Sequence, residues 1–148
     1  MEPYASAAQI YWQANGIRFH YPSEHTIDGT QYALEMQITA DDIYTRAERC
    51  KNNIGAFSLM FEVGDTQSDF WDSFGTSDIQ NLDLSLLFPK TQAMTTQMYS
   101  YVGTDTMPNC TDLMCWYINM PVQTITQATL DMLMVTKVAA NNRATNLG

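Results

Sequence analysis

The sequence has few basic residues and no long apolar run. Its 148 residues include 7 Lys and Arg against 16 Asp and Glu, which gives a formal net charge of −9. Such a surface repels phosphate backbones and anionic lipid, so nucleic acids and membrane surfaces are poor partners and any membrane contact would be indirect. No apolar run approaches the roughly 20 residues of a membrane-spanning helix, and no signal-peptide core is visible.

Cysteine is also scarce, with only Cys50, Cys110 and Cys115 in the chain. They form no CxxC pair and no Cys/His cluster with zinc-finger spacing. Buried thiols, or one disulfide plus one spare thiol, both fit this count, and the pairing is left open. The low charged fraction of 16% resembles secreted or lumenal proteins more than cytosolic ones, but the compartment itself stays unknown.

The hydrophobic content of 45% is enough for the core of a single domain over residues 1–148. Apolar residues alternate or form short runs between Gly, Pro, Asn and Asp, which favours strands. The expected strands are Gln9–Trp12, Ile17–Tyr21, Tyr32–Thr39, Ala56–Val63, Met98–Val102 and Leu113–Asn119. Helices are expected near Gln67–Gly75 or Ser77–Asn81, and over Thr126–Met134. The pattern predicts a mainly β protein with short helices.

Two of the expected strands carry polar side chains on one face. Residues two apart in a strand point to the same side, so Arg18 projects with His20, and Glu35 projects with Gln37. If the two strands are neighbours, these four side chains form one patch. Buried polar groups need partners, so the patch is either a functional site or a satisfied hydrogen-bond network.

Several segments carry the motifs of one known family, in the same order along the chain. The longest is FHYPSEHTIDG, Phe19–Gly29. The others are Tyr32–Met36, Ile54–Gly64, Leu82–Pro89, Tyr99–Cys110, Trp116 and Asn141–Arg143. Together they resemble the α-type carbonic anhydrases, starting roughly a third of the way into that family's domain. The resemblance implies a central, mostly antiparallel twisted sheet with short helices (α+β), here as a single partial, N-terminally truncated domain.

The resemblance also implies where a zinc site would be. Family members hold Zn²⁺ with three histidines, and those positions fall on Arg18, His20 and Gln37, so only His20 is retained. An arginine side chain cannot offer a lone pair to a metal. At about 4 Å and an effective dielectric constant near 20, its charge repels a divalent ion by roughly 8 kcal/mol. We therefore expect no bound metal, no cofactor and no catalytic residues.

Three more family positions surround this vestigial site. Glu24 and Thr106 fall on the pair in which a carboxylate orients a hydroxyl, and Glu35 falls on the carboxylate that orients the third histidine. With that histidine replaced, we expect Arg18 to contact Glu35 or Glu24. Asp105 replaces an apolar residue of the CO₂ pocket, which disfavours CO₂ as a ligand.

These features favour a catalytically inactive, carbonic-anhydrase-like protein that serves as a structural or interaction subunit of a larger assembly. Its partners would be protein subunits that complete or cover the truncated sheet, in a hetero- or homo-oligomer. One alternative is an active zinc-dependent carbonate dehydratase with altered ligands. Another is a binding module that holds a small anion or glycan against Arg18 in the former active-site cleft.

Overall fold

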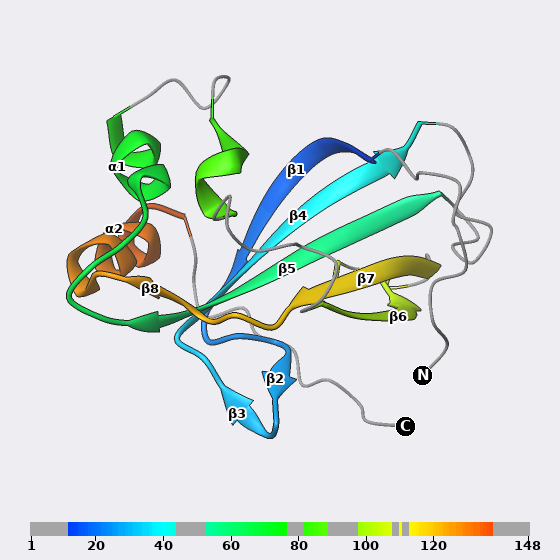
Figure 1. The fold of residues 1–148 in the computed structure, drawn as a ribbon, viewed down its shortest axis with the longest axis horizontal. Helices are drawn as coiled ribbons and strands as arrows, with labels where there is room; N and C mark the ends of the chain where they lie inside the picture. The colour runs from blue at the N-terminus through cyan, green and yellow to red at the C-terminus, as the bar shows by residue number, and fades with distance from the viewer. Residues whose placement is uncertain are drawn as a thin grey trace.

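A twisted, mostly antiparallel sheet with two helices on one face forms the core of the computed structural model (Figure 1). The structure describes residues 12–43, 53–76, 82–88, 98–107, 110 and 113–137. The five main strands lie in the order β1-β4-β5-β7-β6. Their bounds are β1 Trp12–His20, β4 Leu34–Asp42, β5 Ile54–Val63, β6 Met98–Thr104 and β7 Leu113–Asn119.

Most strand pairs are antiparallel, but β5 is parallel to β7 and to the short strand β8, Gln123–Ile125. A separate hairpin consists of β2, Thr26–Ile27, and β3, Thr30–Gln31. Its two-residue loop is Asp28-Gly29, and both residues have positive φ angles, 50° and 78°. Asp-Gly suits this tight hairpin turn because both central residues must adopt φ above zero.

The helices are α1, Asp69–Thr76, the 3₁₀ helix η2, Leu84–Leu87, and α2, Gln127–Lys137. Together with the strands, they confirm the predicted fold class. The predicted strand Leu113–Asn119 coincides with β7, and the helix expected near Gln67–Gly75 is α1. The segments 9–11 and 77–81 of two other predictions lie outside the described residues. The strand β8, the helix η2 and the β2–β3 hairpin were not predicted, because they are too short to show a periodic pattern.

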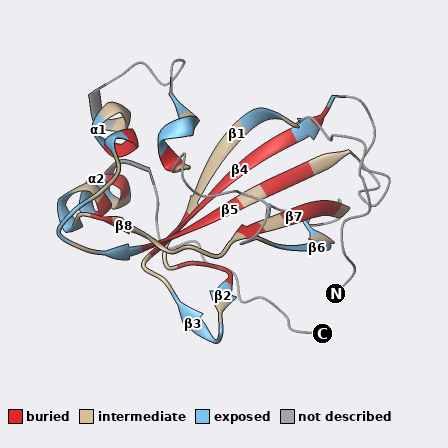
Figure 2. Cartoon of the chain, in the orientation of Figure 1, coloured by how far each residue is buried: buried red, intermediate tan, exposed pale blue. Residues whose placement is uncertain are grey.

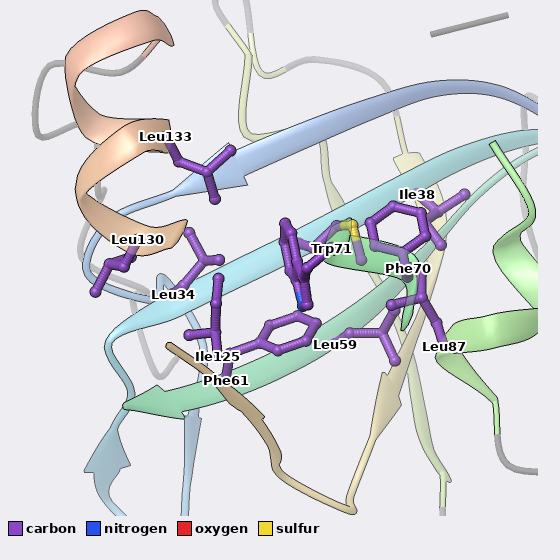
Figure 3. Packing of buried hydrophobic residues seen from close by; sticks show 11 residues of the cluster. Leu34, Ile38, Leu59, Phe61, Phe70, Trp71, Leu87, Ile125, Leu130 and Leu133 are labelled. Carbon is purple, nitrogen blue, oxygen red and sulfur yellow. The ribbon is translucent and has the colours of Figure 1, made fainter. Parts of the chain in front are cut away.

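The helices bury the apolar side of the sheet (Figure 3). Strand alternation places Leu34, Met36 and Ile38 of β4 on this side. Aromatic residues of α1 pack against them, and Trp71 lies edge-to-face on Phe61 of β5 with 5.2 Å between ring centroids. The remaining members of the cluster are Leu59, Phe70, Leu87, Ile125, Leu130 and Leu133.

The opposite side of the sheet combines a smaller apolar cluster with buried polar side chains. Trp116 of β7 packs there with Ala56, Met60, Met114 and Ile118. Figure 2 shows that β4 and β5 are buried along most of their length, whereas β6 is largely exposed. None of the described helices is long and apolar enough to span a bilayer.

Cys115 is disulfide-bonded, while Cys110 is a thiol. This agrees with the reading of one disulfide plus one spare thiol.

Candidate functional site

The four polar side chains of β1 and β4 do lie together. The two strands are antiparallel neighbours, with Arg18 opposite Gln37 and His20 opposite Glu35. His20, Glu35 and Gln37 are buried. The Arg18 side chain, by contrast, is 29% exposed. The neighbouring strands predicted from the sequence therefore create one polar patch on the face opposite the helices.

Arg18 forms an ion pair with Asp105, and its Nη1 lies 2.5 Å from Oδ1 of that carboxylate. The expected contact of Arg18 with Glu35 or Glu24 is therefore wrong. Asp105 is the first residue after β6 and also accepts a hydrogen bond from the backbone N–H of Met107, at 3.1 Å. Glu24 instead contacts His20 and Gln37, and Glu35 contacts His25, Gln37 and Ser58.

Gln37 contacts four of the other family positions, and Glu35 is one of them. Oε1 of Gln37 accepts a hydrogen bond from the Thr106 hydroxyl at 3.2 Å and lies 3.1 Å from Nε2 of His20. Its amide nitrogen donates to Glu24 Oε2 at 3.3 Å. The other ring nitrogen of His20, Nδ1, lies 3.3 Å from Glu24 Oε1. Both nitrogens of His20 thus face oxygen atoms of the protein.

Glu35 is completely buried and receives a full set of donors. The backbone N–H groups of Glu24 and His25 each donate to Oε2 at 2.8 Å. The Ser58 hydroxyl and the Gln37 amide donate to Oε1 at 2.5 and 2.9 Å. The Nδ1 atom of His25 lies 2.6 Å from the same oxygen. Glu35 is therefore not available to Arg18, contrary to the sequence-based expectation.

These contacts set the protonation state of Glu35. Burial raises its pKa, because a charged carboxylate loses hydration. The hydrogen bond and charge interaction with His25, followed by the hydrogen bonds from Ser58 and the His25 backbone, outweigh burial and lower the pKa from 4.5 to about 2. Glu35 is accordingly ionised at neutral pH.

His25 is a buried link between Glu35 and β6. The carboxylate at Nδ1 makes that nitrogen the donor. The Tyr101 hydroxyl lies 2.6 Å from Nε2, and the ring packs 5.0 Å from Trp116. The pKa of Tyr101 is raised by burial first and then by the charges of Glu35 and Glu24. Tyr101 therefore keeps its proton, and His25 is a buried residue with both ring nitrogens in contact with oxygen atoms.

The donors at this patch do not fit a zinc ion. Zinc sites of this kind need three neutral imidazoles or equivalent anionic donors, arranged around an open position. Here Arg18 has no lone pair, Gln37 has both amide atoms in hydrogen bonds, and His20 faces protein oxygens. The described residues contain no group of three His, Cys, Asp or Glu side chains that could hold a metal.

Sequence reasoning missed two members of the network, Ser58 and Tyr101. Ser58 could have been found, because it lies opposite Gln37 in the next strand and alternation places it on the polar face. Tyr101 contacts His25 across 76 positions of sequence, and no local pattern indicates such a pair.

Comparison with known proteins agrees with the resemblance in the sequence. The family model described as eukaryotic-type carbonic anhydrase matches residues 3–147. Alpha carbonic anhydrase 4 of Arabidopsis thaliana is 27% identical over 116 residues, covering 78% of this chain and 42% of the relative. Dioscorin dioA3 of Dioscorea japonica is 26% identical over 148 residues, covering 95% of this chain and 51% of the relative. The chain thus spans about half the length of these two relatives.

The solved structure of the Photobacterium profundum alpha-carbonic anhydrase superposes with a TM-score of 0.74 at 20% identity. The match covers 92% of this chain and 62% of that one, and it confirms the fold. Sequence motifs, family model and fold agree: the chain belongs to the eukaryotic-type carbonic anhydrase family.

Proposed function

We propose that this chain is a catalytically inactive member of the carbonic anhydrase family that serves as a structural or interaction subunit. The proposal rests on the side chains that occupy the positions of the family's zinc ligands. An Arg18–Asp105 ion pair stands at the first ligand position, and Gln37 with its hydrogen-bond partners stands at the third.

The family's chemistry depends on a zinc-bound water whose pKa the metal lowers to about 7, so that hydroxide forms at neutral pH. That chemistry needs lone pairs from all three ligand positions. Asp105 offsets much of the charge of Arg18, so electrostatic repulsion of a cation is weaker than for an isolated guanidinium. The absence of two imidazole donors is therefore the stronger argument against a catalytic metal.

The ion pair also argues against the alternative of an anion-binding cleft. Asp105 already holds the guanidinium of Arg18 at 2.5 Å. An incoming anion would have to displace that carboxylate while Glu24 and Glu35 repel it from nearby. We therefore favour the scaffold role over the binding module.

Two further features support an interaction role. A dioscorin is among the relatives, so the family includes proteins with names other than carbonic anhydrase. In addition, the fold leaves two aromatic side chains on one face of β6 at the surface, with Tyr99 64% and Tyr101 44% exposed. Exposed apolar groups next to one another are typical of contact surfaces. We propose that other protein subunits cover this region in a larger assembly.

Metal analysis combined with a restored variant tests the loss of the zinc site. The purified chain is incubated with zinc, dialysed, and assayed for bound metal and for CO₂ hydration. We expect far less than one zinc per chain and no hydration above the buffer rate. The variant Arg18→His/Gln37→His/Asp105→Leu is expected to bind more zinc than the original chain, because it supplies three imidazoles.

His20→Ala in the restored variant is the matched control, and it should remove the zinc that was gained. Stoichiometric zinc in the unmodified chain, with hydration that a sulfonamide inhibits, would refute the proposal.

A further inference from the structure

A chain of short hydrogen bonds connects strand β6 to the interior of the sheet. The Tyr101 hydroxyl of β6 lies 2.6 Å from Nε2 of His25, and Nδ1 of His25 lies 2.6 Å from Oε1 of Glu35. The imidazole belongs to the segment between β1 and β2, and the carboxylate belongs to β4. In this order of groups, a carboxylate orients an imidazole, and the imidazole can accept the proton of a hydroxyl.

The protons of this chain point in one direction. Nδ1 of His25 faces a carboxylate, which has only lone pairs to offer, so this nitrogen carries a proton. Burial, together with the charges of Glu35 and Glu24, raises the pKa of Tyr101, and its hydroxyl is therefore the donor to Nε2. If the proton moved to Nε2, the resulting imidazolium would lie against the carboxylate of Glu35, which stabilises its positive charge.

This arrangement favours loss of an electron together with a proton from Tyr101. Removing one electron from a phenol makes its hydroxyl strongly acidic, so the reaction is easiest when a base lies within hydrogen-bond reach. Burial and nearby carboxylates disfavour a phenolate, because it is negatively charged. The neutral radical that remains after loss of both particles carries no charge, and these effects do not oppose it.

The neighbours of Tyr101 are less suited to hold the oxidised state. Trp116 stacks on the Tyr101 ring, with 6.2 Å between ring centroids and 12° between planes. The indole N–H of Trp116 donates to the backbone carbonyl of Thr104 at 3.2 Å, and an amide carbonyl is a far weaker base than an imidazole. Tyr99, on the same face of β6, is 64% exposed and has no imidazole within hydrogen-bond distance among the described residues.

We propose that Tyr101 is a redox-active tyrosine that gives one electron to a strong one-electron oxidant of the peroxyl-radical class, while its hydroxyl proton moves to Nε2 of His25. The O–H bond of Tyr101 breaks, and an N–H bond forms on His25. The peroxyl radical gains the electron, takes a proton from water and becomes a hydroperoxide, leaving hydroxide. Tyr101 becomes a neutral tyrosyl radical. This activity goes beyond the proposed scaffold role and does not involve the zinc-ligand positions.

Flash photolysis of the intact chain tests the proton-coupled step. A light flash generates tris(bipyridine)ruthenium(III) as the oxidant, and the tyrosyl radical is followed by optical absorption and by electron paramagnetic resonance. We expect a fast phase whose rate is independent of buffer concentration, because His25 supplies the base. Oxidation of a tyrosine without such a base, as at Tyr99, should instead become faster as basic buffer is added.

Three variants assign the fast phase to its residues. Tyr101→Phe should abolish it, and Tyr99→Phe, the matched control on the same strand, should leave it unchanged. His25→Gln keeps a hydrogen-bonding side chain but removes the base, so it should slow the phase by at least about tenfold. Circular dichroism and thermal unfolding check that each variant is folded. If His25→Gln does not fold, the two tyrosine variants still decide the site, because each removes a single hydroxyl.

Peroxyl radicals released by a water-soluble azo initiator test the class of oxidant. The oxidised positions are located by peptide mass spectrometry. We expect oxidation at Tyr101 in preference to Tyr99, although Tyr101 is the less exposed of the two, at 44% against 64%. In folded His25→Gln this preference should be lost.

Several results would overturn the inference. One is the absence of a fast phase, and another is a fast phase that persists in Tyr101→Phe. Preferential oxidation of Tyr99 by peroxyl radicals, or an unchanged rate in folded His25→Gln, would do so as well. Nitrogen-15 NMR that finds a proton on Nε2 of His25 before oxidation would remove the acceptor, and the contact with Tyr101 would then only brace β6. None of these measurements involves zinc or hydration, so failure here is distinguishable from failure of the pseudoenzyme proposal.

Discussion

The two faces of the central sheet are stabilised by different interactions, although the same strands build both. On the helix side, β4 contributes Leu34, Met36 and Ile38 to an apolar core. On the other side, the intervening residues Glu35 and Gln37 belong to a buried hydrogen-bond network. Alternation along a single strand thus separates a surface held by hydrophobic burial from one held by directed polar contacts.

Because the two faces are held by different interactions, they should tolerate amino-acid substitutions differently. Hydrophobic burial is non-directional and depends on the area removed from water, so the helix side responds to lost volume. A buried polar network depends on every donor finding its acceptor, so its members are sensitive to changes of a single atom. Substitutions on the helix side should therefore lower stability through lost volume, and substitutions on the polar side through lost hydrogen-bond partners.

The largest effect is expected from Trp71→Ala on the helix side. Trp71 is 2% exposed and packs against Phe61 and Phe70. Loss of this volume should lower the free energy of unfolding by about 3–5 kcal/mol, measured by urea denaturation. Val135→Ala, at an exposed position of α2, should change it by less than about 0.5 kcal/mol. A loss from Trp71→Ala no larger than that of the control would contradict the assignment of the main core to this face.

Glu35→Gln tests the polar face with almost no change in volume. The new amide NH₂ would face N–H groups or hydroxyls that now donate to the carboxylate. We expect a loss of about 2–3 kcal/mol in the free energy of unfolding, because buried donors lose their acceptor. Glu62→Gln, on an exposed carboxylate of β5, is the matched control. Equal stability of the two variants would show that the network contributes little.

The pH dependence of the free energy of unfolding should also distinguish the polar face, with its ionised Glu35, from the apolar face. The pKa of Glu35 is lowered from 4.5 to about 2 in the folded chain, so its contribution is complete above about pH 4.5 and is lost as the pH falls toward 2. The stability difference between the original chain and Glu35→Gln should narrow over this interval. Urea denaturation at a series of pH values measures it. A difference that stays constant from neutral pH to pH 2 would disprove the assigned pKa.

The smallest effect is expected at the rim of the polar face. The side chains of Arg18 and Asp105 are 29% and 21% exposed, so water screens their ion pair. A double-mutant cycle with Arg18→Met and Asp105→Asn should give a coupling energy of no more than about 1 kcal/mol. A much larger coupling would mean that this pair is as well shielded as the buried Glu35 network.

Part of the site could be predicted because it depends on local periodicity. Arg18 and His20 are two residues apart, as are Glu35 and Gln37, so their shared face follows from strand geometry once the strands are neighbours. Motifs such as Phe19–Gly29 then indicated the family and the zinc-ligand positions. The partner of Arg18 could not be predicted in this way, because Asp105 is 87 positions away and several carboxylates were available.

The sequence by itself determined the five main strands, the two main helices, the family, and the identity of the residues at the former ligand positions. These depend on side-chain chemistry and on patterns within short segments. Only the tertiary structure decided that Arg18 pairs with Asp105, and that Glu35 accepts hydrogen bonds from Ser58, Gln37 and backbone N–H groups beside His25. The choice among competing carboxylates depends on distance and burial, and both are set only when segments far apart in the chain are packed together.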